Sequence, residues 1–297
     1  MSGNPIIFDR ALLRVRRRRA RALGPEAFLI DRVAADLAER LSAVLRQFDI
    51  AVDLGTPTDA VRTAFTGLTS IGTLIAANPE VTIEDAPAVA ADEESLPFRD
   101  GSLDLVVSAL ALQLVNDLPG ALIQIRRALK PDGLFHAAML GGDTLTELRQ
   151  SFAEAESQIE SGVSPHVAPF TDVREMGALL QRAGMALPVT DVDRLTVRYS
   201  SAFTLMAELR RMGATNVLTE RRRTPLRRAT LLRMAEIYAK RFADRDGRIR
   251  ATFEIVWLSG WAPHESQQKP LAPGSARQRL ADALGAKEIP AGEKAGR

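Results

Sequence analysis

The stretch DLGTPTD at residues 53–59 carries the residue types of a cofactor-binding loop. It follows the apolar run at residues 50–52 and precedes a helix-like segment, which is the strand–loop–helix setting of a nucleotide-type cofactor site. Such loops are rich in glycine because the backbone turns tightly and the ligand approaches bare amides. Gly55 is the only glycine here, so the segment predicts the position of such a site and also a weak hold on its ligand.

The three histidines, His136, His166 and His264, are the other side chains suited to moving a proton near neutral pH. His136 lies inside an apolar stretch and is expected to be structural. His166 and His264 lie in proline-containing loops, where two roles stay open: handling a substrate and its proton, or anchoring the loop through hydrogen bonds. The wide spacing of the histidines predicts no metal site, and the lack of cysteine excludes disulfides, thiolate zinc sites and a cysteine nucleophile.

In the first half of the chain, the elements that position these residues alternate between apolar strands and helices. Strands are expected at residues 50–54, 71–76, 81–84, 88–91, 103–108 and 134–140, and helices at 26–45, 59–67 and 117–130, the last ended by a turn at 131–133. Nearly continuous apolar strands that alternate with helices indicate a parallel sheet covered on both faces. The right-handed crossover rule then predicts a doubly wound α/β sheet.

The second half has a different pattern. A helix is expected after residue 142 with Asp143 as its N-cap, followed by a helix at 172–184, one or two strands at 187–199, helices at 202–212 and 226–242, and a last strand at 251–260. We therefore expect a basic N-terminal arm at 1–24, one domain at 25–262 with a helical insertion near 200–247, and an irregular tail at 263–297.

Arginine is unevenly distributed, although the formal net charge is only +2. One cluster lies at residues 14–21 and a second at residues 221–228. Each cluster has two interpretations: contact with an anionic membrane, RNA or acidic protein, or a solvated helix face. The small net charge argues against general nucleic-acid affinity. No apolar run reaches the roughly 18 residues of a membrane span, and no signal peptide is recognisable, which is compatible with an intracellular protein.

Four segments, taken in order and spacing, resemble the class I S-adenosylmethionine-dependent methyltransferases. They are VDLG (52–55), ADEESLPF (91–98), LDLVVS (103–108) and LKPDG (129–133). The resemblance implies a mostly parallel seven-stranded sheet of the Rossmann-like type, with the helical insertion before its last strand. It also implies an S-adenosylmethionine site built from Asp53, Gly55, Asp92, Glu93 and Ser108.

Further segments across nearly the whole chain resemble a family of methyltransferase-like assembly factors of mitochondrial respiratory complex I and their proteobacterial relatives. They are IFDR (7–10), VNDLP (115–119), GGDTLTELR (141–149), SPHVAPFT (164–171) and GWAPHESQ (260–267). The biotin-pathway malonyl carrier methyltransferase is a more distant resemblance. The closer family implies a protein partner, with a complex I subunit as its candidate. The chemistry proposed for that family is hydroxylation of an arginine side chain rather than methylation. The protein is then expected in the cytoplasm, with the arginine-rich arm able to reach the inner face of a membrane.

The match to the methyltransferase pattern has two gaps. Pro57 and Asp59 stand where the loop's second and third glycines belong, and Asn78 stands where the second strand normally ends in a ribose-binding acid. Losing one charge-assisted hydrogen bond costs roughly 1.5–3 kcal/mol, or about ten- to a hundredfold in affinity. Weak or absent cofactor binding is therefore expected, with His166 and His264 as candidate substrate residues. The alternative is a non-catalytic assembly protein that kept the fold.

Overall fold

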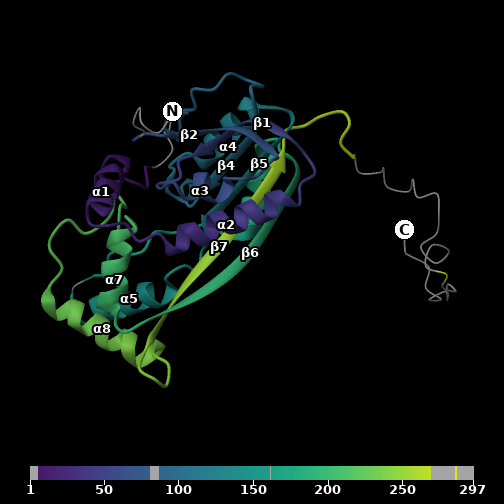
Figure 1. Ribbon diagram of the computed structural model, residues 1–297. Coiled ribbons are helices and arrows are strands. Elements are labelled where there is room, and N and C mark those ends of the chain that lie inside the picture. The colour runs from purple at the N-terminus through teal and green to yellow at the C-terminus, as the bar shows by residue number, and fades with distance from the viewer. Residues whose placement is uncertain (1–5, 81–86, 161, 269–284, 286–297) are drawn as a thin grey trace, which may run out of the picture. The chain divides into compact units, whose positions relative to one another are not determined.

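The computed structural model describes residues 6–80, 87–160, 162–268 and 285 (Figure 1). The chain divides into two units after Pro263, and each is considered by itself. The strand expected at residues 81–84 and most of the tail expected at 263–297 lie outside the described residues.

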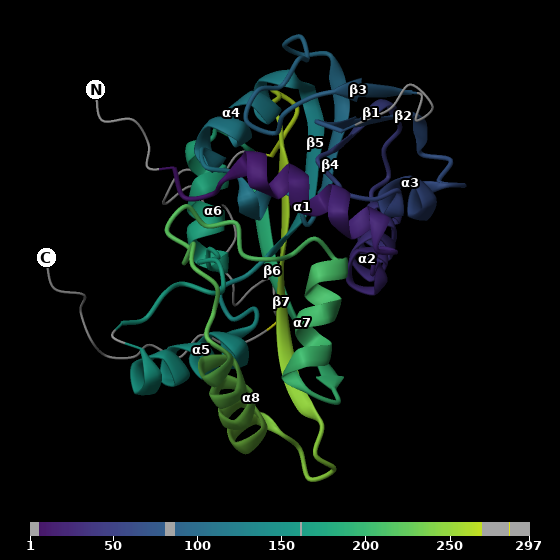
Figure 2. The same ribbon diagram turned by 90° about the vertical axis from the view of Figure 1, so that its left-hand side faces the viewer.

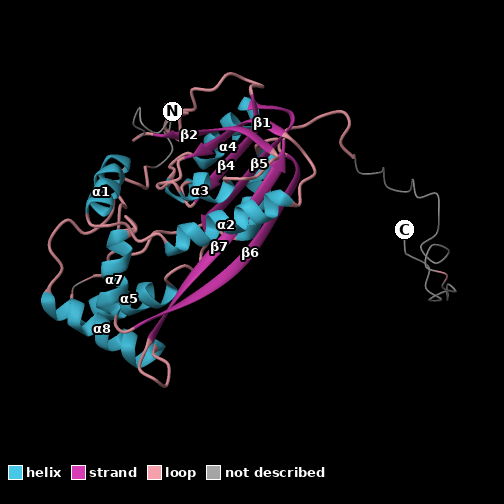
Figure 3. Cartoon of the chain, in the orientation of Figure 1, coloured by secondary structure: helices cyan, strands magenta, loops and turns pink. Residues whose placement is uncertain are grey.

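The first unit is built on one seven-stranded sheet with the order β3-β2-β1-β4-β5-β7-β6. Figure 3 shows its strands in magenta and the helices in cyan. Neighbours from β3 through β5 are parallel, and β7 is antiparallel to both β5 and β6. This confirms the doubly wound, mostly parallel sheet expected from the sequence. The strands are β1 (Phe48–Leu54), β2 (Ile71–Asn78), β3 (Ala88–Ala90), β4 (Leu103–Ala109), β5 (Leu129–Leu140), β6 (Ala186–Tyr199) and β7 (Ile249–Trp261).

Helices cover both faces of the sheet because successive strand residues point to opposite sides. Ala51, Leu105 and Val107 belong to one buried cluster and Val52 and Val106 to the other. The first cluster packs under α2 (Phe28–Ser42), α3 (Ala60–Phe65), α5 (Thr146–Ile159), α7 (Ala202–Arg211) and α8 (Arg228–Phe242). The second packs under α4 (Leu118–Ala128) and α6 (Val173–Arg182). Helices α7 and α8 are the insertion expected before the last strand.

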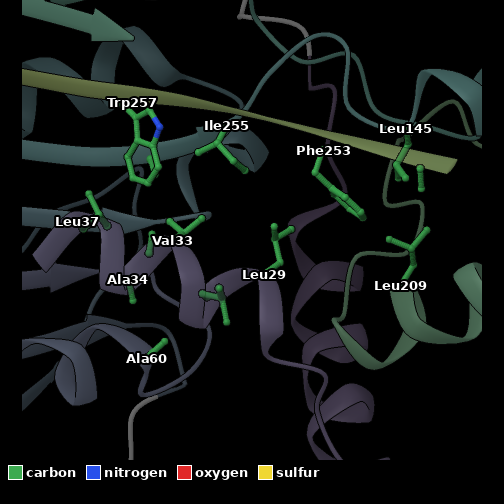
Figure 4. Close-up of a cluster of buried hydrophobic side chains, with 14 of the residues drawn as sticks. Leu29, Val33, Ala34, Leu37, Ala60, Leu145, Leu209, Phe253, Ile255 and Trp257 are labelled. Carbon is green, nitrogen blue, oxygen red and sulfur yellow. The ribbon is translucent and has the colours of Figure 1, made fainter. Parts of the chain in front are cut away.

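Helix α2 illustrates how the sequence pattern produces this packing. Its buried positions recur every three or four residues, which places them on one helix face. Figure 4 shows Val33 and Leu37 on the side of α2 that faces the strand with Ile255 and Trp257. At about 25 cal/mol per Å² of apolar surface, a face of this kind supplies most of the stability of its helix.

Two local predictions need correction. Asp143 does not cap the following helix, because α5 begins at Thr146 and its capping position is Leu145, with φ of +54°. The side chain of Asp143 pairs with Arg194 instead. The turn expected at residues 131–133 lies inside β5 as an irregularity, since the register jumps from Leu129 to Leu134 and Asp132 has a φ of +63°.

The segment expected as a basic arm contains helix α1 (Arg10–Ala22), which packs within the first unit. The Asp9 carboxylate accepts a hydrogen bond from the N–H of Leu12 and so caps the helix. Phe8 and Leu13 join a small buried cluster with Val217 and Leu218 from the loop after α7. Helix α1 is thereby fixed to the domain at both its start and its buried face.

Candidate functional site

The strand order reverses between β1 and β4, and ligands of open α/β sheets bind at such a point, beside the carboxyl ends of the strands. We call the ends of β1, β2, β3 and β4, with the loops that follow them, the cofactor edge. The loop at residues 53–59 lies there, as do Asp92, Glu93 and Ser108. The fold thus brings together five residues that the sequence resemblance groups into one site.

The side chains of Asp53 and Ser108 form hydrogen bonds inside the cofactor edge. The Asp53 carboxylate accepts a hydrogen bond from the hydroxyl of Thr56, and that hydroxyl accepts the N–H of Ala109 at 3.2 Å. The hydroxyl of Ser108 donates to the carbonyl of Leu54 at 2.8 Å. Asp53 is 6% exposed and Ser108 is fully buried. Both side chains therefore tie the end of β1 to the end of β4.

Burial also changes the acidity of Asp53. Removal from water raises the pKa of this carboxyl to about 7, because a buried charge loses its hydration, although the hydrogen bond from Thr56 and the charge of Arg62 act in the opposite direction. Near neutral pH the group is consequently a mixture of acid and carboxylate.

Gly55 faces Glu93 rather than open space. Its φ of +75° lies in the region that favours glycine, and a Cβ added there would lie 2.6 Å from Oε1 of Glu93. The Glu93 side chain is only 1% exposed. The one remaining glycine of the loop is thus covered by an acidic side chain at the place where a cofactor would approach the backbone.

Helix α1 runs along the cofactor edge and neutralises its acids (Figure 2). Arg10 pairs with Glu93 and, at 2.8 Å, with Asp92, and Arg14 pairs with Asp92 at 2.7 Å. These contacts link residues about eighty positions apart in the chain. Burial acts to lower the pKa of Arg10, but the charges of Glu93 and Asp92 outweigh it and raise the pKa.

A third acid at this edge, Glu80, was not identified from the sequence. It lies two residues beyond β2 and pairs with Arg21 at 2.9 Å and Arg18 at 3.6 Å. Asn78, the expected partial substitute for a ribose-binding acid, accepts the N–H of Glu80 at 2.9 Å. The feature of the sequence that could have identified Glu80 is the position of this acid shortly after the end of β2. We refer to Glu80, Asp92 and Glu93 as the edge acids.

A cavity of about 170 Å³ lies beside the cofactor edge. Its walls come from α1, α2, the loops after β1, β4 and β5, the start of α5, Phe253 of β7, the loop at residues 166–170 and the segment at 209–217. Pro57, Thr58 and Leu110 line it from the side of the sheet ends, and His166 lines it from the opposite loop. None of Asp53, Gly55, Asp92, Glu93 and Ser108 is among its lining residues.

His166 has a defined setting in this cavity wall. Its Nε2 lies 2.8 Å from Oε1 of Glu156 and 3.2 Å from the hydroxyl of Ser164, and its ring stacks on Phe152 with 3.9 Å between centroids. Burial would raise the pKa of Glu156, but the N–H of Ser164 and the ring of His166 outweigh it and lower the pKa. A carboxylate that holds one imidazole nitrogen is an arrangement that orients the other nitrogen for proton transfer. The sequence pointed to His166 but not to its contacts with Glu156, Ser164 and Phe152.

The other two histidines have different surroundings. His136 lies in β5 and is 7% exposed, and burial together with the nearby charge of Arg40 lowers its pKa to about 4. It is therefore neutral under ordinary conditions. His264 belongs to the second unit, where its Nδ1 lies 2.7 Å from the hydroxyl of Ser266.

The residues implied for S-adenosylmethionine do not fit that cofactor as they are arranged. Gly55 is covered, Asp53 and Ser108 are engaged internally, and the edge acids are paired with arginines of α1. An adenosine moiety would have to displace these ion pairs before it reached a carboxylate.

The second arginine cluster is also largely paired with acids of the same chain. Arg221 pairs with Asp9 at 3.1 Å, and Arg222 and Arg227 pair with Glu160 at 3.3 and 3.5 Å. Within the described ranges, no group of three or more acidic or histidine side chains is placed to hold a metal ion. None of the helices formed by the described residues is both long enough and apolar enough to span a membrane.

Known proteins show the same fold and family. Residues 52–137 match the family model described as a methyltransferase domain. The Danio rerio protein named arginine-hydroxylase NDUFAF5, mitochondrial, is 38% identical over 288 residues, which cover 93% of this chain and 89% of that protein. The Laribacter hongkongensis malonyl-[acyl-carrier protein] O-methyltransferase is 40% identical over 190 residues, which cover 64% of this chain and 61% of that protein.

A solved structure shows that the fold, taken alone, is similar to that of a methyltransferase. A candidate methyltransferase from Bacillus halodurans matches with a TM-score of 0.52 and 14% identity over 77% of this chain and 99% of that one. The NDUFAF5 relatives confirm the family indicated by the sequence motifs. The chain belongs to the family of the arginine-hydroxylase NDUFAF5 proteins and has the fold of the class I methyltransferases.

Proposed function

We propose that this chain is an assembly factor of respiratory complex I that acts on a protein partner and binds S-adenosylmethionine weakly or not at all. The observation that carries the proposal is the set of ion pairs between α1 and the edge acids. The likeness to NDUFAF5 proteins over 93% of the chain supports the assembly role, because it extends well beyond the region matched by the methyltransferase model.

Two modes of action follow from different observations. The paired edge acids favour a non-catalytic factor, in which the fold serves to present a binding surface. The oriented His166 in the cavity wall favours modification of the partner, either by methyl transfer or in the manner that the name arginine-hydroxylase states for the relatives. The pairing of α1 arginines with the edge acids also leaves fewer cations of the arm for a membrane surface.

Gene deletion with complementation tests this function. Cells without the chain should accumulate incomplete complex I on native gels, and the wild-type gene should restore the full complex. Mass spectrometry of the restored subunits should show an arginine heavier by one oxygen or one methyl group if the chain is catalytic. The variant His166→Gln should abolish that mass change, whereas His264→Gln, from the other candidate loop, should retain it.

The outcomes separate the candidates. Full assembly without the modification in the His166→Gln strain indicates a catalytic role that assembly does not require. Restored assembly by the wild-type gene with no modified arginine supports the non-catalytic factor. Normal complex I in cells that lack the chain would contradict the assembly function itself.

A further inference from the structure

Arg17 is a buried cation without a hydrogen-bonding acceptor among the described residues. Its side chain is 12% exposed and lines the cavity beside the cofactor edge. Its closest acidic contact is Oε1 of Glu93, 3.8 Å away, and the other oxygen of Glu93 is held by Arg10. A guanidinium carries five N–H donors, and its hydrogen bonds to an anion are stronger than those between neutral groups. The cavity wall therefore presents a cation that an entering anion can pair with.

The other charged groups of the cavity wall are already paired. Arg21 pairs with Glu80 at 2.9 Å. Arg211 pairs with Glu26 at 3.5 Å and donates to the carbonyl of Gly24 at 2.8 Å. Glu26 is the only acidic residue of the lining, so the cavity carries an excess of positive charge.

The pKa of Arg17 is consistent with the charges around the cavity. Burial lowers its pKa, and the neighbouring cations Arg10 and Arg21 add to that effect, so that the attraction of Glu93 does not compensate. An arriving anion would relieve this cost by replacing lost hydration with hydrogen bonds. Charge-assisted bonds of a guanidinium to a carboxylate are strong because both N–H groups of the planar fork are used.

The remaining walls of the cavity are mainly apolar. Leu13, Leu29, Ile30, Leu145, Leu148 and Phe253 contribute to the lining. A volume of about 170 Å³ is close to that of cavities known to accept benzene. The site therefore has room for a small apolar body next to its cationic group.

We propose that this cavity binds a small carboxylate with an apolar body, and that Arg17 is the residue that pairs with the carboxylate. The carboxylate belongs either to a free acid or to the methionyl end of a nucleoside cofactor, since both present the same group. A guanidinium does not suit the cavity, because it would face Arg17, Arg21 and Arg211.

Benzoate and benzamidine test the proposal as ligands of matched shape and opposite charge. Titration of the full-length protein, followed by ligand-observed NMR and by the Nε–Hε signal of Arg17, should show binding of benzoate and none of benzamidine at the same concentration. The variant Arg17→Gln should weaken benzoate at least about tenfold, as expected for the loss of a charge-assisted bond. Arg14→Gln, which removes an α1 arginine outside the cavity lining, should leave benzoate binding unchanged.

Three results would overturn the proposal: benzamidine binding as well as benzoate, benzoate binding to Arg17→Gln as to wild type, or no benzoate binding at all. The comparison of the two ligands uses wild-type protein alone, so it stands even if Arg17→Gln does not fold. Addition of S-adenosylhomocysteine then separates the two sources. Displacement of benzoate assigns the carboxylate site to the cofactor's methionyl end, and retention of benzoate assigns it to a separate acid.

Discussion

Replacing Asp53 with asparagine should raise the free energy of unfolding by about 4 kcal/mol more at pH 8 than at pH 4. Burial raises the pKa of Asp53 to about 7 from an ordinary 3.8, so the folded protein holds this proton more tightly than the unfolded chain. The associated stability is complete below pH 3.8 and is lost as the pH rises toward 7. Asparagine keeps the oxygen that accepts from Thr56 and removes the ionisation.

His136 changes the stability with pH in the direction opposite to Asp53, so removing the ionisation of Asp53 leaves a clear pH dependence from His136. Its pKa falls to about 4 in the folded state from an ordinary 6.5, so its contribution is present above pH 6.5 and is lost as the pH falls toward 4. In wild-type protein the two groups largely cancel between pH 4 and 6.5. In Asp53→Asn only His136 still titrates between pH 4 and 6.5. The free energy of unfolding of this variant should therefore rise by about 3 kcal/mol as the pH increases over that range.

Urea unfolding at a series of pH values measures both effects. Asp49→Asn is the matched control, because Asp49 is an exposed carboxylate on the same strand. Its pH profile should follow wild type. A profile of Asp53→Asn that runs parallel to wild type from pH 4 to 8 would show that Asp53 titrates as an ordinary carboxylate.

The second large effect is expected for Arg10→Gln, which should destabilise the protein by about 3–5 kcal/mol. The change leaves Glu93, whose side chain is 1% exposed, with Arg17 at 3.8 Å as its remaining cation. Breaking a buried pair on one side is costly because the other charge stays in a poorly hydrated position. Adding Glu93→Gln to Arg10→Gln should recover part of the loss, since the buried carboxylate is then gone and only Arg17 loses its acidic contact.

Arg14→Gln serves as the control for this experiment. Arg14 also pairs with an edge acid, but its side chain is 44% exposed, and exposed pairs contribute about 1 kcal/mol or less. Thermal and urea unfolding of the single and double variants provide the measurement. Equal small losses for Arg10→Gln and Arg14→Gln would mean that α1 does not neutralise a buried acid.

The fold was largely predictable because its signals are local. The apolar run at residues 103–108 became β4 and the periodic segment at 117–130 became α4, since burial of continuous or periodic apolar residues admits few alternatives. The place of the loop at residues 53–59 followed from the strand before it and the helix after it. The segment of β5 at residues 131–133 shows the limit, because a turn-forming sequence was accommodated as a strand irregularity.

The candidate site was less predictable because its contacts are distant in sequence. The arginines of α1 have the pattern of a solvated helix face, and only the fold places Arg10 against Glu93 and Arg21 against Glu80. The pairing of His166 with Glu156 depends on where α5 ends and how the next loop returns, which no spacing rule specifies. Residue types therefore indicated the position of the site, while its electrostatic state emerged only from tertiary contacts.

Closure of the cofactor edge by α1 is tested most directly by calorimetric titration of the wild-type protein with S-adenosylmethionine and S-adenosylhomocysteine. Displacing the ion pairs of the edge acids should reduce the affinity for both ligands to a Kd of about 1 mM or weaker, which gives no resolvable heat at micromolar ligand. A Kd in the low micromolar range for either ligand would contradict it, because the edge acids would then be available to the cofactor.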